Sequence, residues 1–543
     1  MSDIPFAPNL PSAVLDSAHE GDIRGALGTI HRGHPHAAAR SRLGARLRTL
    51  AAILGPGLIV MVGDNDAGAF STYSQAGQNF GVHLLWTLPL LIPVLYVNQE
   101  MVLRLGAVTG VGHARLIFAR FGRFWGAFSV IDLFLLNALT IVTEFIGITL
   151  ALDYLGVPRL AGLAAAAALV IAAAGTGSFR RFERFALALC AGSLLLVPVF
   201  IWVHPPLGQI GVNLLVPSLP HHAALSDVML LIIGIVGTTI APWQLFFQQS
   251  YVIDKRITPR FIPYEKIDLW IGIVVVLVGA IAIMAAAAAA FGGTAAFGQF
   301  TDAGSVARGL AAKGGHLAGI LFAIALLDAS IIGAAAVSLA TAYAIGDVLS
   351  LKHSLHRKAT DARGFYAVYA GLILAAGLIV VFGNASLLGL LTNAVQTLAG
   401  VLLPSATVFL LLLCNDPEVL GPWVNGRLTN LFTGAVIWLL VLLSLILTAA
   451  TLFPSLSGRL MVEILAVGSL VGLFALAVPR ARGGGRPAQS GRDRATWRMP
   501  RLESLAPLSL SRAQRAWMGV LRLYLAGAMV MVIVKVANLA LGH

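Results

Sequence analysis

The stretch that decides the fold is GPGLIVMVGDNDAGAFSTYSQAG (residues 55–77). It has the apolar character of a membrane helix, but two acids and an amide interrupt it near its middle. Polar groups are costly at membrane depth and therefore mark candidate functional positions. Glycine and proline weaken a helix. We therefore predict a helix break at Gly68, with Asp66 and Asn65 beside it.

A second stretch of the same kind is GIVGTTIAPWQLFFQQS (residues 234–250), in which Gly237 and Pro242 predict a second break. It lies five predicted spans after the first, and an odd offset reverses the orientation of a helix in the membrane. Interrupted helices at matching positions of two inverted halves indicate the central site of a transporter. The alternative, that glycine and proline only kink two spans, stays open because membrane helices tolerate both.

The composition agrees with a membrane protein. Of 543 residues, 58% are apolar and only 11% are charged, whereas a soluble domain has roughly 25% charged residues. This excludes a soluble enzyme of the same length. The formal net charge of +13 would suit a nucleic-acid binder, but the bases lie between apolar stretches and fit the loops of a multi-pass membrane protein better. We predict no nucleic-acid partner.

Twelve apolar runs are long enough to cross a bilayer, which takes about 20 residues in a helix. They lie near residues 50–72, 82–104, 125–154, 158–177, 184–204, 226–252, 267–291, 316–348, 364–383, 386–414, 428–453 and 460–479. A further run, 516–541, follows an Arg-rich segment, and whether it crosses the membrane stays open. We predict an all-α fold in which spans 1–5 and 6–10 form a 5+5 inverted repeat, with one to three extra helices at the C-terminus.

The loops predict the orientation. If the N-terminus is cytoplasmic, almost all of the 37 Lys and Arg residues fall on the cytoplasmic side, as membrane proteins prefer. We therefore predict a cytoplasmic N-terminus. We also expect a monomer in the plasma (inner) membrane, surrounded by the lipid bilayer. The predicted units are a basic cytoplasmic N-terminus (1–48), a first repeat (49–204), a second repeat (226–414), spans 11 and 12 (428–479), a cytoplasmic linker (480–515) and an additional apolar helix (516–541).

The chemistry of the breaks indicates a cation. Unwound helix exposes backbone carbonyls, and Asp66 adds a negative charge that is unfavourable in hydrocarbon unless a cation, a proton or water meets it. A carrier of organic solutes would instead present helix N-termini to a carboxylate. A membrane hydrolase would need a His-Glu-x-x-His or serine-base arrangement, which the sequence lacks. We therefore expect an ion transporter with no cofactor.

At these residues the chain resembles the NRAMP divalent-metal transporters. Gly55–Gly57 and Gln75–Gly77 bracket Asp66-Ala67-Gly68-Ala69 where that family has Asp-Pro-Gly-Asn. The resemblance implies a LeuT-type fold, with Asp66 and the backbone carbonyl of Thr238 as metal ligands. Further positions match the family's sixth-span Met-Pro-His motif, its second histidine, its tenth-span glutamine and its third-span glutamate: Ala241-Pro242-Trp243, Gln248, Gln396 and Glu144.

The departures from the family pattern point to the ion. Ala69 and Ala241 stand where the family has an asparagine and a methionine ligand. Thioethers favour transition metals, whereas carboxylates, carbonyls and water suit Mg²⁺, which keeps several of its waters. The pattern is most similar to the NRAMP-related magnesium transporters, and it implies that Ala69, Ala241, Trp243 and Gln396 line the pocket. The alternative is a proton-coupled Mn²⁺/Fe²⁺ transporter of the classical type.

Proton coupling is expected to be lost. The family's coupling histidines and third-span aspartate correspond to Trp243, Gln248 and Ile141, none of which titrates near neutral pH. Uptake of Mg²⁺, and of Mn²⁺ beside it, would then follow the membrane potential. Secondary polar or vestigial coupling positions are Glu144, Gln248, Asp328 and Asn65.

Overall fold

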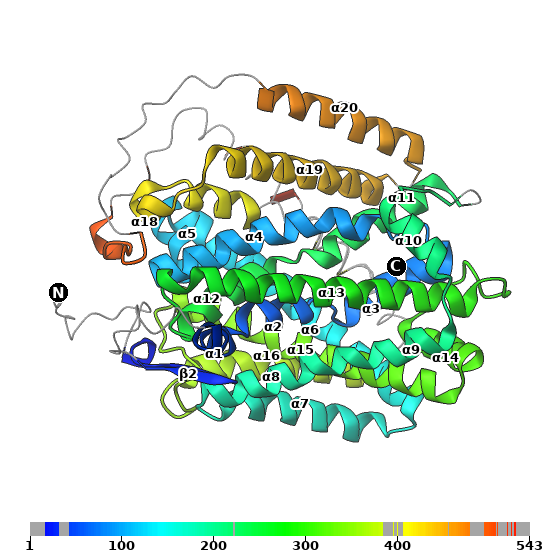
Figure 1. Cartoon of the computed structure of the whole chain (residues 1–543), viewed down its shortest axis with the longest axis horizontal. Helices are drawn as coiled ribbons and strands as arrows, with labels where there is room; N and C mark the ends of the chain where they lie inside the picture. Colours follow the sequence, from blue (N-terminus) through cyan, green and yellow to red (C-terminus); the bar gives the residue numbers. More distant parts are fainter. Residues whose placement is uncertain are drawn as a thin grey trace.

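The computed structural model describes residues 17–31, 43–220, 223–383, 406–453, 455–477 and 494–505, with isolated positions at 392, 395, 399, 508, 519, 523, 526 and 527. The predicted pocket residue Gln396 and the predicted helix 516–541, apart from four isolated positions, lie outside this part of the chain. Most long helices run side by side in one direction (Figure 1). Among the described residues, eight helices are long and apolar enough to cross a membrane, or nine if one bent pair is counted.

A short hairpin precedes the helices. It comprises η1 (Ser17–His19), β1 (Ile23–Gly25) and β2 (Gly28–Ile30), and the two strands pair antiparallel. The first half of the bundle comprises α1 (Leu43–Ile53), α2 (Pro56–Val62), α3 (Ala67–Phe80), α4 (Thr87–Thr109), α5 (His113–Phe121), α6 (Arg123–Leu155), α7 (Arg159–Gly175), α8 (Phe179–Gly192), η3 (Ser193–Leu195) and α9 (Leu196–Val203).

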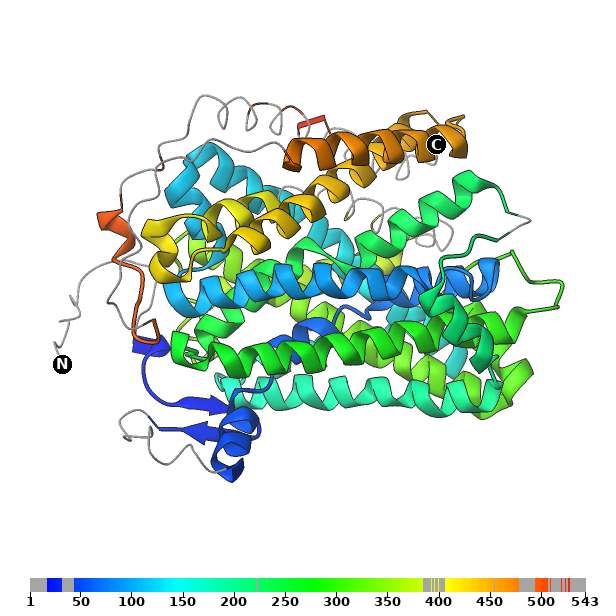
Figure 2. The ribbon, with the colours of Figure 1, turned by 45° about the horizontal axis from the view of Figure 1, so that its top comes forward.

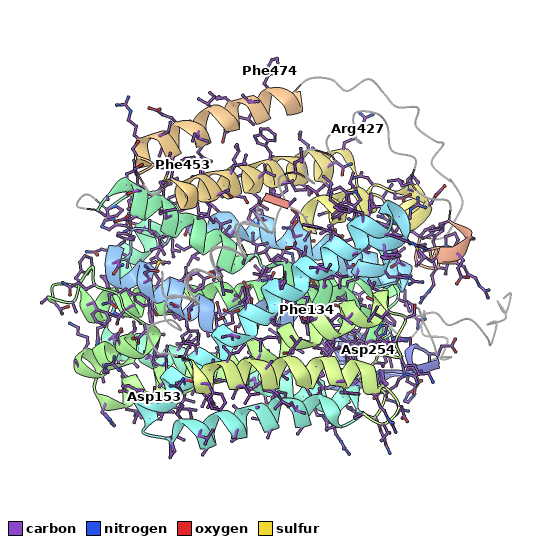
Figure 3. The ribbon with its side chains drawn as sticks, turned by 180° about the vertical axis from the view of Figure 1, so that it is seen from behind. Phe134, Asp153, Asp254, Arg427, Phe453 and Phe474 are labelled. Atoms are coloured by element: carbon purple, nitrogen blue, oxygen red, sulfur yellow. The ribbon has the colours of Figure 1, made fainter. Side chains whose placement is uncertain are left out.

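The second half follows the short helix α10 (Leu207–Leu215). It comprises α11 (Leu225–Thr239), α12 (Pro242–Asp254), η4 (Pro259–Phe261), α13 (Ile262–Phe291), α14 (Ala303–Gly314), α15 (His316–Val348) and α16 (Arg363–Phe382). The C-terminal elements are α18 (Pro417–Leu420), η5 (Gly421–Trp423), α19 (Arg427–Leu452), α20 (Gly458–Ala477) and η6 (Leu502–Ser504). Helices α19 and α20 pack together at the edge of the bundle, where Phe474 points outward (Figure 3).

Both predicted interruptions are present, but one is misplaced in the prediction. The first break is the non-helical link Gly63–Asp66, and Gly68 lies inside the first turn of α3. The reason is that the Asp66 carboxylate caps α3, so the helix already begins at Ala67. The second break is Ile240–Ala241: Gly237 lies in the last turn of α11, and Pro242 is the first residue of α12.

The two broken spans lie against each other inside the bundle. Helix α3 contacts α11, and α2 contacts α12, which is the pairing of two antiparallel spans. Helix α13 packs on both α2 and α3. At the crossing of α2 and α13 a side chain would not fit, because a Cβ on Gly57 would lie 2.6 Å from the backbone nitrogen of Leu269. This close approach holds the first break next to α13.

An ion-pair cluster lies under the N-terminal hairpin at one end of the bundle. The hairpin and α1 project from that end (Figure 2). The Lys255 ammonium lies 2.6 Å from the Glu183 carboxylate and donates to the carbonyl oxygens of Ile53 and Leu54 at 2.5 and 2.9 Å. The other oxygen of Glu183 accepts a hydrogen bond from the Ala26 amide at 2.5 Å. The hairpin, the bend after α1, α8 and α12 are thereby tied together.

Glu183→Gln should strongly destabilise the protein, because both side chains of the pair are fully buried and removing one partner leaves an uncompensated buried charge. The expected loss is about 3–5 kcal/mol, seen as a lower melting temperature of the purified full-length chain in detergent. Glu463→Gln is the matched control, since it removes the exposed pair with Arg459. Equal melting temperatures for both variants would contradict a stabilising role for the buried pair.

Candidate metal site

The first break presents Asp66 at the start of α3. Its Oδ1 accepts a hydrogen bond of 2.9 Å from the Ala69 amide, which makes it the N-cap of the helix. Anionic side chains are favourable at helix N-termini, where amide groups lack intrahelical partners. The side chain is buried. The break therefore creates a place inside the bundle where a carboxylate is stabilised without a basic residue.

Glu144 lies beside Asp66. Its Oε2 accepts a hydrogen bond of 3.1 Å from the amide of Ala67, the residue that follows Asp66. Helix α15 approaches both through a glycine: a Cβ on Gly333 would lie 2.8 Å from Cδ of Glu144 and 3.0 Å from Cβ of Asp66. The third-span glutamate predicted as a secondary position thus lies next to the residue predicted as the metal ligand.

The second break faces the first through hydroxyl groups. The Thr238 and Thr72 hydroxyls are 3.2 Å apart, and the Tyr73 hydroxyl is 2.8 Å from that of Thr239. Thr238 and Thr239 form the last turn of α11, and carbonyls of a last turn fall outside the helical hydrogen-bond ladder. Pro242 is the first residue of α12, where the missing amide hydrogen of proline breaks no helical hydrogen bond. The Thr238 carbonyl stays a proposed ligand.

Gln244 links the two breaks, and the sequence prediction did not include it among the site residues. Its amide nitrogen donates to Oδ1 of Asp64 and, at 3.4 Å, to the Thr239 carbonyl. Its amide oxygen accepts a hydrogen bond of 2.9 Å from Gln99 of α4. The sequence marks Asp64 as a candidate because it lies in the interrupted stretch. Gln99 is a single amide within an apolar span, and no sequence motif marks it as a site residue.

Trp243, Ala69 and Ala241 lie next to the breaks. The Trp243 ring is fully buried, and its Cη2 atom would lie 3.6 Å from a Cβ on Gly63, so the indole packs against the first break. Ala69 is in the first turn of α3, and Ala241 is the residue before α12. That these three side chains line an ion pocket remains a proposal, but each is placed at a helix break.

Three other predicted positions differ in their surroundings. The side-chain amide of Asn65 donates a hydrogen bond of 3.0 Å to the Val276 carbonyl oxygen, which connects the break to α13. Gln248 is buried, and neither of its amide atoms has a hydrogen-bond partner within the described part of the chain. The Asp328 carboxyl lies 2.3 to 2.6 Å from the place of a Cβ on Gly192, so it contacts α8. Asp328 is therefore the weakest of the predicted candidates.

A cavity of about 220 Å³ reaches the first break from the end opposite the hairpin. Ala67 and Gly147 line it beside Asp66 and Glu144, and Asp153 and Asp302 also border it. Asp153 lies near the end of α6, and Asp254, which ends α12, lies at the opposite end of the molecule (Figure 3). Among the described residues, this cavity leads toward the site from the end opposite the hairpin, where Lys255 pairs with Glu183.

Known proteins with this fold and sequence are metal transporters. Residues 57–450 match the family described as natural resistance-associated macrophage protein-like, Nramp. The divalent metal cation transporter MntH of Ralstonia nicotianae is 30% identical over 404 residues, which cover 71% of this chain and 87% of that protein. MntH of Lacticaseibacillus casei is 27% identical over 422 residues, covering 75% and 90%.

A solved structure with the same fold is the manganese transporter of Eremococcus coleocola in complex with an aromatic bis-isothiourea substituted compound. The TM-score is 0.62 at 21% identity, with 84% of this chain and 96% of that chain covered.

The fold and the polar groups at two paired helix breaks define a multi-pass membrane transporter of the LeuT type, with a 5+5 inverted repeat. The chain belongs to the Nramp family. It is accordingly a divalent metal ion transporter.

Asp66→Asn should abolish transport, because it removes a negative charge at the helix break while keeping the side chain's size and its acceptor oxygen for the Ala69 amide. The measurement is Mn²⁺ influx into proteoliposomes with equal amounts of folded protein. Asp328→Asn serves as the control, since that carboxyl contacts α8, and it should keep most of the wild-type flux. Near-normal influx through Asp66→Asn would rule out Asp66 as a ligand.

Proposed function

We propose that the protein imports divalent cations by alternating access, with Mg²⁺ as the main ion and Mn²⁺ as a second substrate. The observation that supports this is the all-oxygen character of the groups gathered at the first break. Asp66, Glu144 and Asp64 are carboxyl groups, and the second break adds threonine hydroxyls and carbonyls. Such donors suit Mg²⁺, which is usually held through one or two carboxylates and retained waters.

The absence of a thioether at one position adds to this proposal. Ala241 precedes α12 where the family pattern has a methionine, so the soft donor that favours transition metals is missing there. A small side chain also leaves room for water on the ion. Ala69 has the same effect at the start of α3. Both alanines make a partly hydrated ion the better substrate.

We propose that the membrane potential drives uptake without protons. Trp243, Gln248 and Ile141 stand at the family's coupling positions and are buried without a titratable group. For a divalent ion the potential contributes about 4.6 kcal/mol per 100 mV, from roughly 2.3 per charge. That is sufficient for accumulation. The cavity opposite the hairpin would then face outward, in a monomer with a cytoplasmic N-terminus.

A proton-coupled Mn²⁺ transporter is the second candidate, and one contact favours it. The side chains of Asp66 and Glu144 both lie against Gly333, and two carboxyl groups that share a site favour a proton on one of them. A metal ion that binds Asp66 would displace that proton. The relatives named as MntH and the manganese transporter agree with this alternative. Whether the displaced proton crosses the membrane decides between the two mechanisms.

Proteoliposomes with a pH-sensitive dye inside separate these candidates. An inside-negative potential should drive Mg²⁺ influx. The lumenal pH should stay constant during this influx, and the influx rate should not change with the external pH. The control is Asp66→Asn in the same vesicles. Robust Mn²⁺ influx with lumenal acidification, together with no Mg²⁺ influx, would establish the classical proton-coupled mechanism in place of this proposal.

Ala241→Met should shift selectivity from Mg²⁺ toward Mn²⁺ and Cd²⁺, because it returns a thioether to the start of α12. Competition of each ion against Mn²⁺ influx gives the selectivity directly. Ala241→Leu adds similar volume without sulfur and is the matched control. Selectivity that is equal for the methionine and leucine variants would show that residue 241 does not face the ion.

A further inference from the structure

We infer that Asp64 is a second ion-binding carboxylate, and that Gln244 and Gln99 orient it toward the transported ion. The inference rests on the proposed function in that it takes the first break as the ion site. Asp64 lies in the link Gly63–Asp66, two residues before the proposed ligand, and is 1% exposed. The two carboxylates together would balance both charges of a divalent ion.

The hydrogen bonds of Asp64 leave one oxygen for a ligand. Oδ1 accepts from the Gln244 amide, while Oδ2 is buried and has no hydrogen-bond partner among the residues that the structure describes. A buried polar oxygen without a partner is costly. A bound cation, with or without a bridging water, supplies the missing interaction.

Two other buried acids, Asp254 and Asp268, are satisfied by several donors each. Asp254 accepts hydrogen bonds from the hydroxyls of Tyr343 and Ser354 and from the Leu355 amide. Asp268 accepts two backbone amides, from Gly57 at 2.7 Å and Leu58 at 3.3 Å. These carboxylates hold helix ends and loops together. Asp64 has a single side-chain donor at a break in the helix, which is the arrangement of a ligand and not of a structural cap.

The partners of Asp64 are neutral, and this is essential to the inference. Gln99 donates to the oxygen of Gln244, so the nitrogen of Gln244 is directed at Asp64 and at the Thr239 carbonyl. An amide fixes the position of the carboxylate and leaves its charge in place, whereas a lysine ammonium would cancel that charge. Within the described part of the chain, Asp64, Asp66 and Glu144 form no ion pair with a basic side chain. The negative charge is thus retained for the ion.

The neutral donors also connect both halves of the transporter. Gln244 is in α12, directly after the second break, and Gln99 is in α4 of the first half. A movement of α12 relative to α2 and α3 would shift Gln244 against Asp64. Gln244 is therefore a positioning residue: it acts on the ion through Asp64.

Equilibrium binding of Mn²⁺ and of Mg²⁺ to the full-length protein in nanodiscs, by isothermal titration calorimetry, tests the inference. Asp64→Asn should raise the dissociation constant at least about tenfold, and Gln244→Leu should do so within the 10- to 100-fold range typical of groups that orient metal ligands. Gln244→Lys should weaken binding as much as Asp64→Asn, because its ammonium would pair with Asp64. The melting temperature of each variant separates loss of binding from loss of folding.

Glu265→Gln is the matched control. Glu265 is fully buried in the first turn of α13, and neither of its carboxylate oxygens has a hydrogen-bond partner among the described residues. Its removal should leave the dissociation constants unchanged. Folded Asp64→Asn protein with wild-type affinity for both ions would overturn the inference. If the wild type binds Mn²⁺ but not Mg²⁺, the proposed magnesium function fails, while the comparison of variants with Mn²⁺ still decides the role of Asp64.

Discussion

The fold is organised around Asp64, Asp66 and Glu144, three buried carboxyl groups that form no ion pair with a basic side chain in the described part of the chain. An uncompensated charge in hydrocarbon is too costly to persist, so the fold must offer it hydrogen-bond donors and a cation. The break between α2 and α3 supplies both conditions. It frees the Ala69 and Ala67 amides to bind Asp66 and Glu144, and it leaves oxygens for an ion.

The surrounding helices keep this break in place. Gly57 of α2 and Gly333 of α15 let the backbones of neighbouring helices approach, where any larger side chain would collide with backbone or with the carboxyl groups. Gln244 connects Asp64 to the second break. At the hairpin end, Lys255 and Glu183 fix the bend between α1 and α2. The buried ion pair thus lies at the hairpin end of the bundle, and the cavity that reaches the first break lies toward the opposite end.

The sequence predicted the architecture well because its signals are local and strong. Apolar runs, interrupted twice by glycine, proline and polar residues, were sufficient to predict an all-helical bundle with two broken spans, and the family comparison and the solved relative confirm that fold. The location of the first break was less predictable. Gly68 has the lower helix propensity, but the capping bond of Asp66 begins α3 at Ala67, and this bond depends on a side-chain conformation that composition does not reveal.

The site could be predicted only in part, since its contacts join distant segments. Asp66 and Glu144 were identified from motifs, and the structure brings them together. Gln99 and Gln244 bind each other across 145 positions of sequence, a distance over which periodicity carries no information. Asp328 shows the opposite case: an acid in an apolar span that contacts α8 through Gly192. Burial of an acid identifies a candidate, and only the fold decides what it faces.

The proposed ion site lies at the first helix break, between the carboxylates of Asp64 and Asp66. The most direct measurement is a structure of the protein soaked with Mn²⁺, located by its anomalous scattering. We expect one peak within coordination distance of Asp66 and close to Asp64, and a weaker peak when Mg²⁺ competes. A peak elsewhere, for example beside Asp328, with none at the break, would contradict this placement.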